Sequence, residues 1–218
     1  TTEIYTLSLH DALPIFVSTD KYMRAILDKE KGLMPGSKAV LSHVTVMEIP
    51  SYHKLLVVGD VAIIPLPDFK QKVAITNFLI QTAHALGIEC PKVALIAASE
   101  QVLPGIPANE DAAIISKMAD RGQIKGAYID GPLALDPALD KESAEIKKVG
   151  GKVAGDADCL MFPNIESGNV FYKAGTKLMN AELAAMVMGA KVPAVLSSRG
   201  DSEKTKLYSI ALAALAAK

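Results

Sequence analysis

The chain has 218 residues, 50% of them hydrophobic, and its 23 Lys and Arg residues nearly balance 24 Asp and Glu residues. The formal net charge of -1 provides no overall field for a nucleic acid or an anionic membrane, so any anion site must be local. A globular protein with a sizeable core is expected. No apolar run reaches membrane-span length and no signal peptide is recognisable, which favours a cytoplasmic protein.

In chain order, residues 1–15 (TTEIYTLSLHDALPI) read like a one-frame translation of a sequencing-library adapter. We expect them to be non-native and the natural start to be missing. A genuine short helix or strand is the alternative.

From Phe16 onward, short β-branched apolar runs alternate with segments of helical period, which predicts βα units around a mostly parallel sheet and an α/β fold. Turn and capping residues bound the predicted elements. The strands are expected at 39–47, 54–59, 93–97, 126–129, 159–162 and 194–196. The helices are expected at 19–30, 68–86, 109–121, 138–149, 168–188 and 202–217.

The two cysteines, Cys90 and Cys159, show no CxxC or Cys/His ligand spacing, and the four histidines show no HExxH pattern. We therefore expect two buried, reduced thiols and no metal site.

The segment SSRGDS lies between the last predicted strand and the last predicted helix. Backbone N–H groups at a helix N-terminus attract anions, and Gly200 would let the backbone approach a ligand closely. Arg199 could bind a phosphoryl group through two parallel hydrogen bonds. Alternatively, Ser198 or Ser202 is only an N-cap and Arg199 is a solvated surface charge.

Two further segments are candidates for substrate binding. In DGPLALD, Asp130 is predicted at a strand end, with Gly131 and Pro132 forcing a turn, and strand ends are where α/β sheets bind ligands. Ordinary turn chemistry is the alternative. In PNIESGNVFYK, Gly168 and Asn169 open a helix with Lys173 one turn inside, as a binding rim or merely as a capped helix start.

Asp60, in VVGDVAI, follows a predicted strand and is a third candidate for substrate binding, although a lone carboxylate there is commonly a cap or turn residue. The glycines of GGKVAG lack dinucleotide-binding spacing, and no GxxxxGK[ST] motif is present, which argues against a nucleotide site.

Taken in order, VLSHVTV, RGQIKGAYIDGPLALD, KVAGDADCLMFPNIESGNVFYK, GAKVPAVLSSRGDS and KLYSIALA resemble the phosphate acetyl/butyryltransferase family, most closely its butyryltransferase branch. The resemblance implies an isocitrate/isopropylmalate dehydrogenase-like three-layer α/β/α sandwich with two domains and a homodimer or higher homo-oligomer. Residues 16–37 and 197–218 would be remnants of an incomplete first domain, and 38–196 would form the second.

The resemblance also implies that acyl-CoA and inorganic phosphate are substrates, that no cofactor is needed, and that Ser198 and Arg199 line the site. The acetyltransferase branch has an aspartate where this chain has Thr205, and an arginine near Thr176 that has no counterpart here, which favours the butyryl branch. Asp201 or Glu203 could supply the carboxylate instead.

Two rival functions are weighed against this one. A metal- and NAD-dependent decarboxylating dehydrogenase would share the fold but needs clustered aspartates, which do not stand out. An acyl-CoA-sensing regulatory domain, as found fused to malic enzymes, would share the family motifs.

Overall fold

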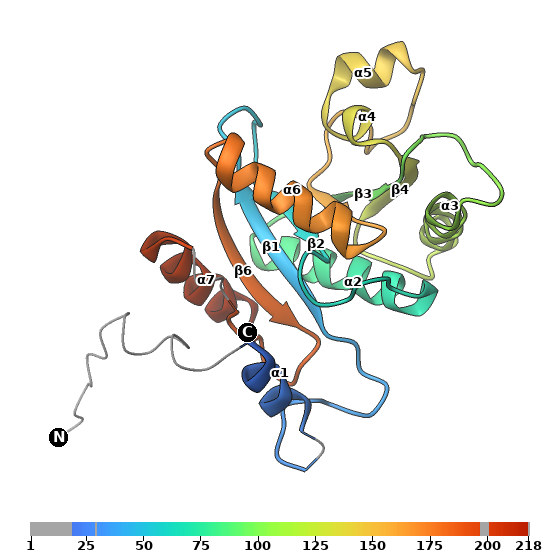
Figure 1. The fold of residues 1–218 in the computed structure, drawn as a ribbon. Coiled ribbons are helices and arrows are strands. Elements are labelled where there is room, and N and C mark those ends of the chain that lie inside the picture. Colours follow the sequence, from blue (N-terminus) through green and yellow to red (C-terminus); the bar gives the residue numbers. More distant parts are fainter. Residues whose placement is uncertain (1–18, 29, 197–200, 218) are drawn as a thin grey trace.

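The computed structural model describes residues 19–28, 30–196 and 201–217 (Figure 1). Ser198, Arg199 and Gly200 lie outside the described residues. So do residues 1–18, which include the suspected adapter translation.

A six-stranded sheet in the order β4-β3-β5-β2-β1-β6 forms the centre of the fold. Only β1 opposes the common direction: it pairs antiparallel with β2 and, along its whole length, with β6. The register runs from Ser42 opposite Met188 to Glu48 opposite Glu182. The α/β class is confirmed, with one antiparallel strand inside the parallel set. The strands are β1 (Ser42–Glu48), β2 (Leu56–Gly59), β3 (Lys92–Ile96), β4 (Tyr128–Leu133), β5 (Cys159–Met161) and β6 (Glu182–Met188).

Helices cover both faces of this sheet and make three layers (Figure 1). One face carries α2 (Phe69–Ala85), α3 (Pro107–Asp120) and α7 (Glu203–Ala216). The other carries α4 (Leu135–Leu139) and α6 (Ile165–Leu178), and α5 (Lys141–Ile146) packs against α4.

Alternation along the strands divides the core between the two faces. On β1, Val44 and Val46 join the cluster under α2 and α7, whereas Met47 joins the cluster under α6. A third, smaller cluster forms where Ile26 of α1 (Thr19–Leu27) packs near Val187.

Local signals explain the helix starts. Asp68 accepts a hydrogen bond from the Gln71 backbone N–H while the Gln71 side chain accepts one from the Asp68 backbone, a complete capping box. Ser202 caps α7 by accepting from the Thr205 backbone N–H at 3.1 Å. Both starts follow the predictions closely.

The predicted helix 168–188 is confirmed only as far as Leu178 and is wrong beyond it. Helix α6 begins earlier, at Ile165, and ends at Leu178; Asn180 then adopts a left-handed conformation with φ 52, and the chain continues as β6. The apolar run ELAAMVM suits helix or strand by composition, and full-length pairing with β1 decides for strand.

Smaller corrections concern other elements. The expected helix 138–149 is two short helices, because Asp140 ends α4 and caps α5. The expected strand 194–196 is a single bridge between Val187 and Ala194. Cys90 is exposed rather than buried; burial of Cys159 is confirmed, and that burial raises the pKa of its thiol.

Candidate functional site

The candidate site lies at the edge of the sheet where the parallel strands end. Strands β2 to β6 all point to this edge, and β1 begins there because it runs the opposite way. Helix α6 starts at the same edge, directly after β5. Ligands of open α/β sheets bind at this kind of edge.

Four polar side chains gather here between β1, α6 and the chain segment before α7, and we call them the His43 cluster: His43, Thr45, Tyr172 and Asp201. His43 is only 5% exposed. Its Nε2 lies 3.4 Å from the carbonyl oxygen of Leu196, and its Nδ1 lies 3.3 Å from the hydroxyl of Thr45. The buried hydroxyl of Tyr172 donates to the Asp201 carboxylate at 3.2 and 3.3 Å from its two oxygens.

Burial sets the charge states in the cluster. Desolvation lowers the pKa of His43, and the negative charges of Asp60 and Asp201 oppose this without reversing it, while the nearby positive charge of Lys173 lowers the pKa further. Burial, followed by the charge of Asp201, raises the pKa of Tyr172. At neutral pH the cluster therefore holds a neutral imidazole and a protonated phenol beside a carboxylate.

Asp60 lies next to the cluster and organises the turn after β2. One carboxylate oxygen accepts from the backbone N–H groups of Ala62 at 2.7 Å and Ile63 at 2.9 Å. The other accepts from those of His43 at 3.2 Å and Ile64 at 3.3 Å. With 2% of its surface exposed and four backbone donors, Asp60 fits the turn-residue alternative, and its expected contact with substrate remains a prediction.

The start of α6 docks on this turn. The Asn169 side-chain amide donates to the Val61 carbonyl at 3.0 Å. Gly168 packs so closely that an added Cβ would lie 2.3 Å from the Asp60 carbonyl oxygen. Lys173 is exposed and lies over the Tyr172 ring, with its Nζ 4.8 Å from the ring centroid. The structure thus brings Asp60, Gly168, Asn169 and Lys173 together.

Thr205, which the family resemblance compares with an aspartate of the acetyltransferase branch, lies in the first turn of α7. Thr205 is buried, and its hydroxyl lies 3.1 Å from that of Ser202. Of the two carboxylates considered as substitutes, Asp201 is half-buried against Tyr172, whereas Glu203 is exposed.

Asp130, Gly131 and Pro132 are not brought to the His43 cluster. The expectation that Asp130 ends a strand is wrong, because β4 continues through it to Leu133. Strand β4 lies at one border of the sheet and β6 at the other. Burial raises the pKa of Asp130, and Gly131 packs so tightly that a Cβ would lie 2.6 Å from the Cβ of Leu95.

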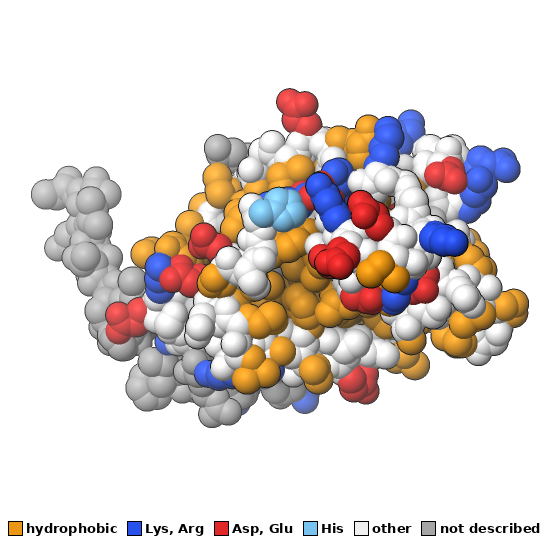
Figure 2. Space-filling view, turned by 90° about the horizontal axis from the view of Figure 1, so that it is seen from above, with side chains coloured by type: hydrophobic (Ala, Val, Ile, Leu, Met, Phe, Trp, Pro, Cys, Tyr) orange, Lys and Arg blue, Asp and Glu red, His pale blue; other side chains and the backbone are white. Residues whose placement is uncertain are grey.

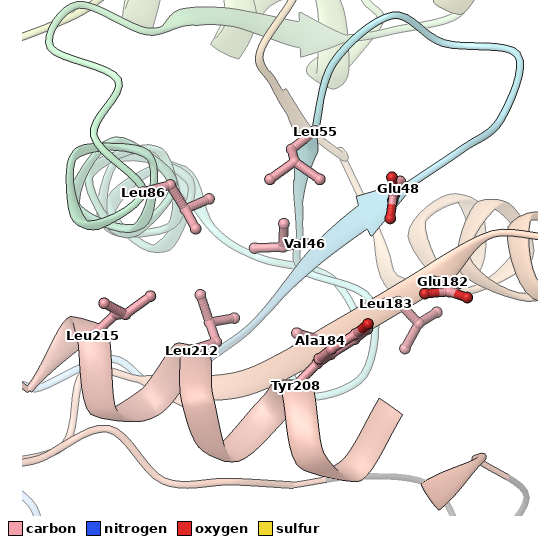
Figure 3. Close-up of a pocket in the computed structure, with 10 residues that line it drawn as sticks. All are labelled: Val46, Glu48, Leu55, Leu86, Glu182, Leu183, Ala184, Tyr208, Leu212 and Leu215. Carbon is pink, nitrogen blue, oxygen red and sulfur yellow. The ribbon is translucent and has the colours of Figure 1, made fainter. Parts of the chain in front are cut away.

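Two hollows flank the sheet. One, of about 350 Å³, lies between α1 and the chain around residues 37–41 and 63–71, and therefore borders the turn that Asp60 organises. The other, of about 190 Å³, is an apolar groove between α7 and the end of α2 (Figure 3). Because Glu48 at the end of β1 and Glu182 at the start of β6 line it, the groove reaches the edge of the sheet opposite the His43 end of β1.

On the face seen from above in Figure 2, basic and acidic side chains and a histidine lie around hydrophobic side chains that reach the surface. Among the described residues, no group of three or more His, Cys, Asp or Glu side chains could hold a metal ion. Of the helices in the described part of the chain, none is both long and apolar enough to cross a membrane.

His43, Thr45 and Tyr172 were not predicted as site residues. The available signal was alternation in SHVTVME, where His43 and Thr45 lie on one face of the strand and the apolar Val44 and Val46 lie on the other. The contact between Tyr172 and Asp201 joins residues 29 positions apart and has no local signature.

Solved structures with this fold define its class. The chain is similar to a branched-chain phosphotransacylase from Enterococcus faecalis V583, with a TM-score of 0.81 and 32% identity, covering 92% of this chain and 71% of that one. It is also similar to a phosphotransacetylase from Streptococcus pyogenes, with a TM-score of 0.72 and 26% identity, covering 90% of this chain and 58% of that one. The fold is that of the phosphotransacylases.

Sequence comparison gives the family. The family described as Phosphate acetyl/butaryl transferase matches residues 15–214, and the chain belongs to it. It is 49% identical over 201 residues to phosphate butyryltransferase of Clostridium acetobutylicum, covering 92% of this chain and 66% of the relative. It is 44% identical over 199 residues to phosphate acetyltransferase of Thermotoga maritima, covering 91% and 67%. The chain thus spans about two thirds of the length of these relatives.

Proposed function

We propose that this protein transfers a short acyl group, in the first place butyryl, between coenzyme A and inorganic phosphate, without a metal or other cofactor. The observation that carries the proposal is 49% identity over 92% of the chain to a phosphate butyryltransferase. The capped start of α7, directly after SSRGDS, supports it as an anion site. Acetyl and branched acyl groups are further candidate substrates.

In the proposed reaction, a phosphate oxygen attacks the thioester carbonyl carbon and forms a C–O bond. The tetrahedral oxyanion then collapses, the C–S bond breaks, and CoA leaves as the thiolate with the bonding pair, yielding acyl phosphate. Arg199 and the amides at the start of α7 would hold the phosphate, and Ser198 would donate a hydrogen bond to the oxyanion. In reverse, a carboxylate would take the thiol proton, and we assign this role to Asp201, which is half-buried against Tyr172, rather than to the exposed Glu203.

We infer supporting roles for the other predicted residues. Gly168, Asn169 and Lys173, at the start of α6, would form one rim of the site, with the Lys173 ammonium facing the anionic substrates. Gly200 and Ser202 would present the backbone of the α7 start. Asp130, Gly131 and Pro132 would contact only a part of coenzyme A that extends toward β4.

The wider context is also proposed. We assign residues 16–37 and 197–218 to a first domain and residues 38–196 to a second. We infer that the protein is a cytoplasmic homodimer or higher homo-oligomer. We also infer that it acts in butyrate metabolism and binds neither nucleic acid nor membrane. Helix α7, in the proposed first domain, packs on the sheet of the proposed second domain. The contact includes Leu212 and the Ser209 hydroxyl, which accepts a hydrogen bond from the Ala185 N–H at 2.9 Å. Helix and sheet would then form the contact between the two domains.

The test is CoA release from butyryl-CoA with phosphate, using the protein expressed from its complete gene. Arg199→Ala should reduce kcat/KM for phosphate at least 100-fold, and Ser198→Ala should lower kcat about 10²–10³-fold. Arg121→Ala is the matched control, since Arg121 is exposed at the end of α3, away from the His43 cluster. Normal kinetics of Arg199→Ala would overturn the assignment. Binding of butyryl-CoA without turnover would favour the acyl-CoA-sensing alternative.

A further inference from the structure

The larger hollow, of about 350 Å³, lies at the same edge of the sheet as the His43 cluster. Its walls come from α1, from residues 37–41 directly before β1, and from residues 63–71 between the turn after β2 and the start of α2. Figure 1 shows α1 at this end of the sheet. One Asp60 carboxylate oxygen accepts from the backbone N–H groups of His43, in the cluster, at 3.2 Å and of Ile64, in the wall of the hollow, at 3.3 Å. The hollow therefore adjoins the candidate site.

Much of the lining is apolar. Met23 and Leu27 of α1 line the hollow together with Met34, Leu41 and Ile63. The volume is within the range of small-molecule sites, about 300–1,000 Å³. A butyryl group has only three carbons beyond its carbonyl and would leave most of this space empty. The hollow therefore suits a longer ligand with an apolar stretch.

The charged lining residues are two lysines, Lys38 before β1 and Lys70 in the first turn of α2, and one carboxylate, Asp68. Both lysines are exposed, and neither has an ion-pair partner within the described part of the chain. The Asp68 carboxylate is engaged, because it accepts from the Gln71 backbone N–H at 2.8 Å. Two positive charges against one negative charge favour an anionic ligand here.

The apolar groove beside α7 differs in both respects. Its charged lining residues are Glu48 and Glu182, and its volume is about 190 Å³. Negative charge at its border would repel a phosphate-bearing ligand. Of the two hollows, only the one beside α1 combines space, apolar surface and positive charge.

We propose that the hollow beside α1 is the subsite for the phosphopantetheine arm of coenzyme A, with the arm against the apolar wall and Lys38 and Lys70 binding its phosphates. This ligand matches the lining because a flexible chain with two amides separates its thiol from a pyrophosphate group. The inference rests on the proposed function, which supplies coenzyme A as a substrate, and adds the place where the arm binds.

The lysines are tested by titration calorimetry with coenzyme A and the protein expressed from its complete gene. Lys38→Ala and Lys70→Ala should each raise the Kd about threefold and the double variant about tenfold, since exposed charge pairs contribute modestly. Lys125→Ala is the matched control, because Lys125 is equally exposed but lies before β4, at the opposite edge of the sheet. An unchanged Kd in the double variant would overturn the proposal.

The apolar wall is tested separately. Leu27, the last residue of α1, is 49% exposed, and Leu27→Ala should raise the Kd for coenzyme A about threefold. Leu178→Ala is the matched control, since Leu178 ends α6, is 80% exposed and does not line the hollow. ADP, which has the pyrophosphate but lacks the arm, should bind at least tenfold more weakly than coenzyme A. Equal affinity for ADP would indicate a general phosphate site and would contradict the assignment.

Kinetics separate this inference from the proposed function. In butyryl transfer, the double lysine variant should raise KM for butyryl-CoA about tenfold, with kcat and KM for phosphate unchanged. A rise in KM for phosphate alone would assign the lysines to the other substrate and refute the subsite. If the protein binds coenzyme A through these lysines but transfers no acyl group, the proposed function fails and the subsite stands. If both KM values are normal in the double variant, the subsite fails and the proposed function stands.

Discussion

Gly168 offers the sharpest test of how α6 is docked at the candidate site. In Gly168→Ala the new Cβ would lie 2.3 Å from the Asp60 carbonyl oxygen and 3.3 Å from the Val61 Cα. Both partners are backbone atoms of a turn that four hydrogen bonds to the Asp60 carboxylate hold in place. The helix start must therefore move away from the turn, and the Asn169 contact with Val61 is strained or lost.

The magnitude follows from two opposing effects. Overpacking typically costs about 1–3 kcal/mol, and a rigid partner at this distance favours the upper end of that range. Alanine recovers about 1 kcal/mol over glycine inside a helix. The net expectation is a loss of about 2 kcal/mol in the free energy of unfolding, or a fall of about 1 M in the urea midpoint.

Gly175, in the same helix, is the matched control. Its nearest obstacle is the Cε of Met47 at 2.2 Å, the far end of a flexible side chain that can rotate away. Gly175→Ala should therefore lie within about 1 kcal/mol of the unsubstituted protein. If urea unfolding showed Gly168→Ala to be as stable as Gly175→Ala, the tight docking of α6 on the Asp60 turn would be refuted.

Two titratable side chains, Asp156 and His43, should make the stability of the protein depend on pH. Partial burial of Asp156 opposes its ionisation, but hydrogen bonds from Lys92, Lys54 and His53 outweigh burial and hold its pKa well below the usual range. Asp156→Asn should therefore lower the unfolding free energy above about pH 4, with the deficit shrinking in more acidic buffers; a deficit independent of pH would count against this. Because burial lowers the pKa of His43, the unfolded chain takes up the proton first, and stability should fall below about pH 6.5. His43→Gln should flatten that part of the profile in thermal melts; an unchanged slope would contradict it.

Local chemistry made much of the fold predictable. The capping residues Asp68 and Ser202 marked helix starts because their side chains satisfy backbone N–H groups within three residues. Strand β6 was missed because alanine and leucine suit a helix equally well, and only pairing with β1 selects the extended form. Residues near Asn180 gave too weak a stop signal to separate α6 from β6.

The site was predictable only in part, for a related reason. Gly168, Asn169 and Asp60 stood at element ends, where a sequence reveals candidates, but their mutual contacts depend on how α6 crosses the sheet. The neighbours of His43 come from β1, α6 and the segment before α7, so no single stretch of sequence encodes the cluster.

The most direct test of the proposed transfer follows the oxygen atoms of phosphate. The protein expressed from its complete gene would be incubated with butyryl-CoA and fully ¹⁸O-labelled phosphate, and the products would be analysed by mass spectrometry. Attack by a phosphate oxygen predicts butyryl phosphate that retains every labelled oxygen, formed in equal amount to free CoA. Release of CoA with unlabelled butyrate and no acyl phosphate would contradict the account.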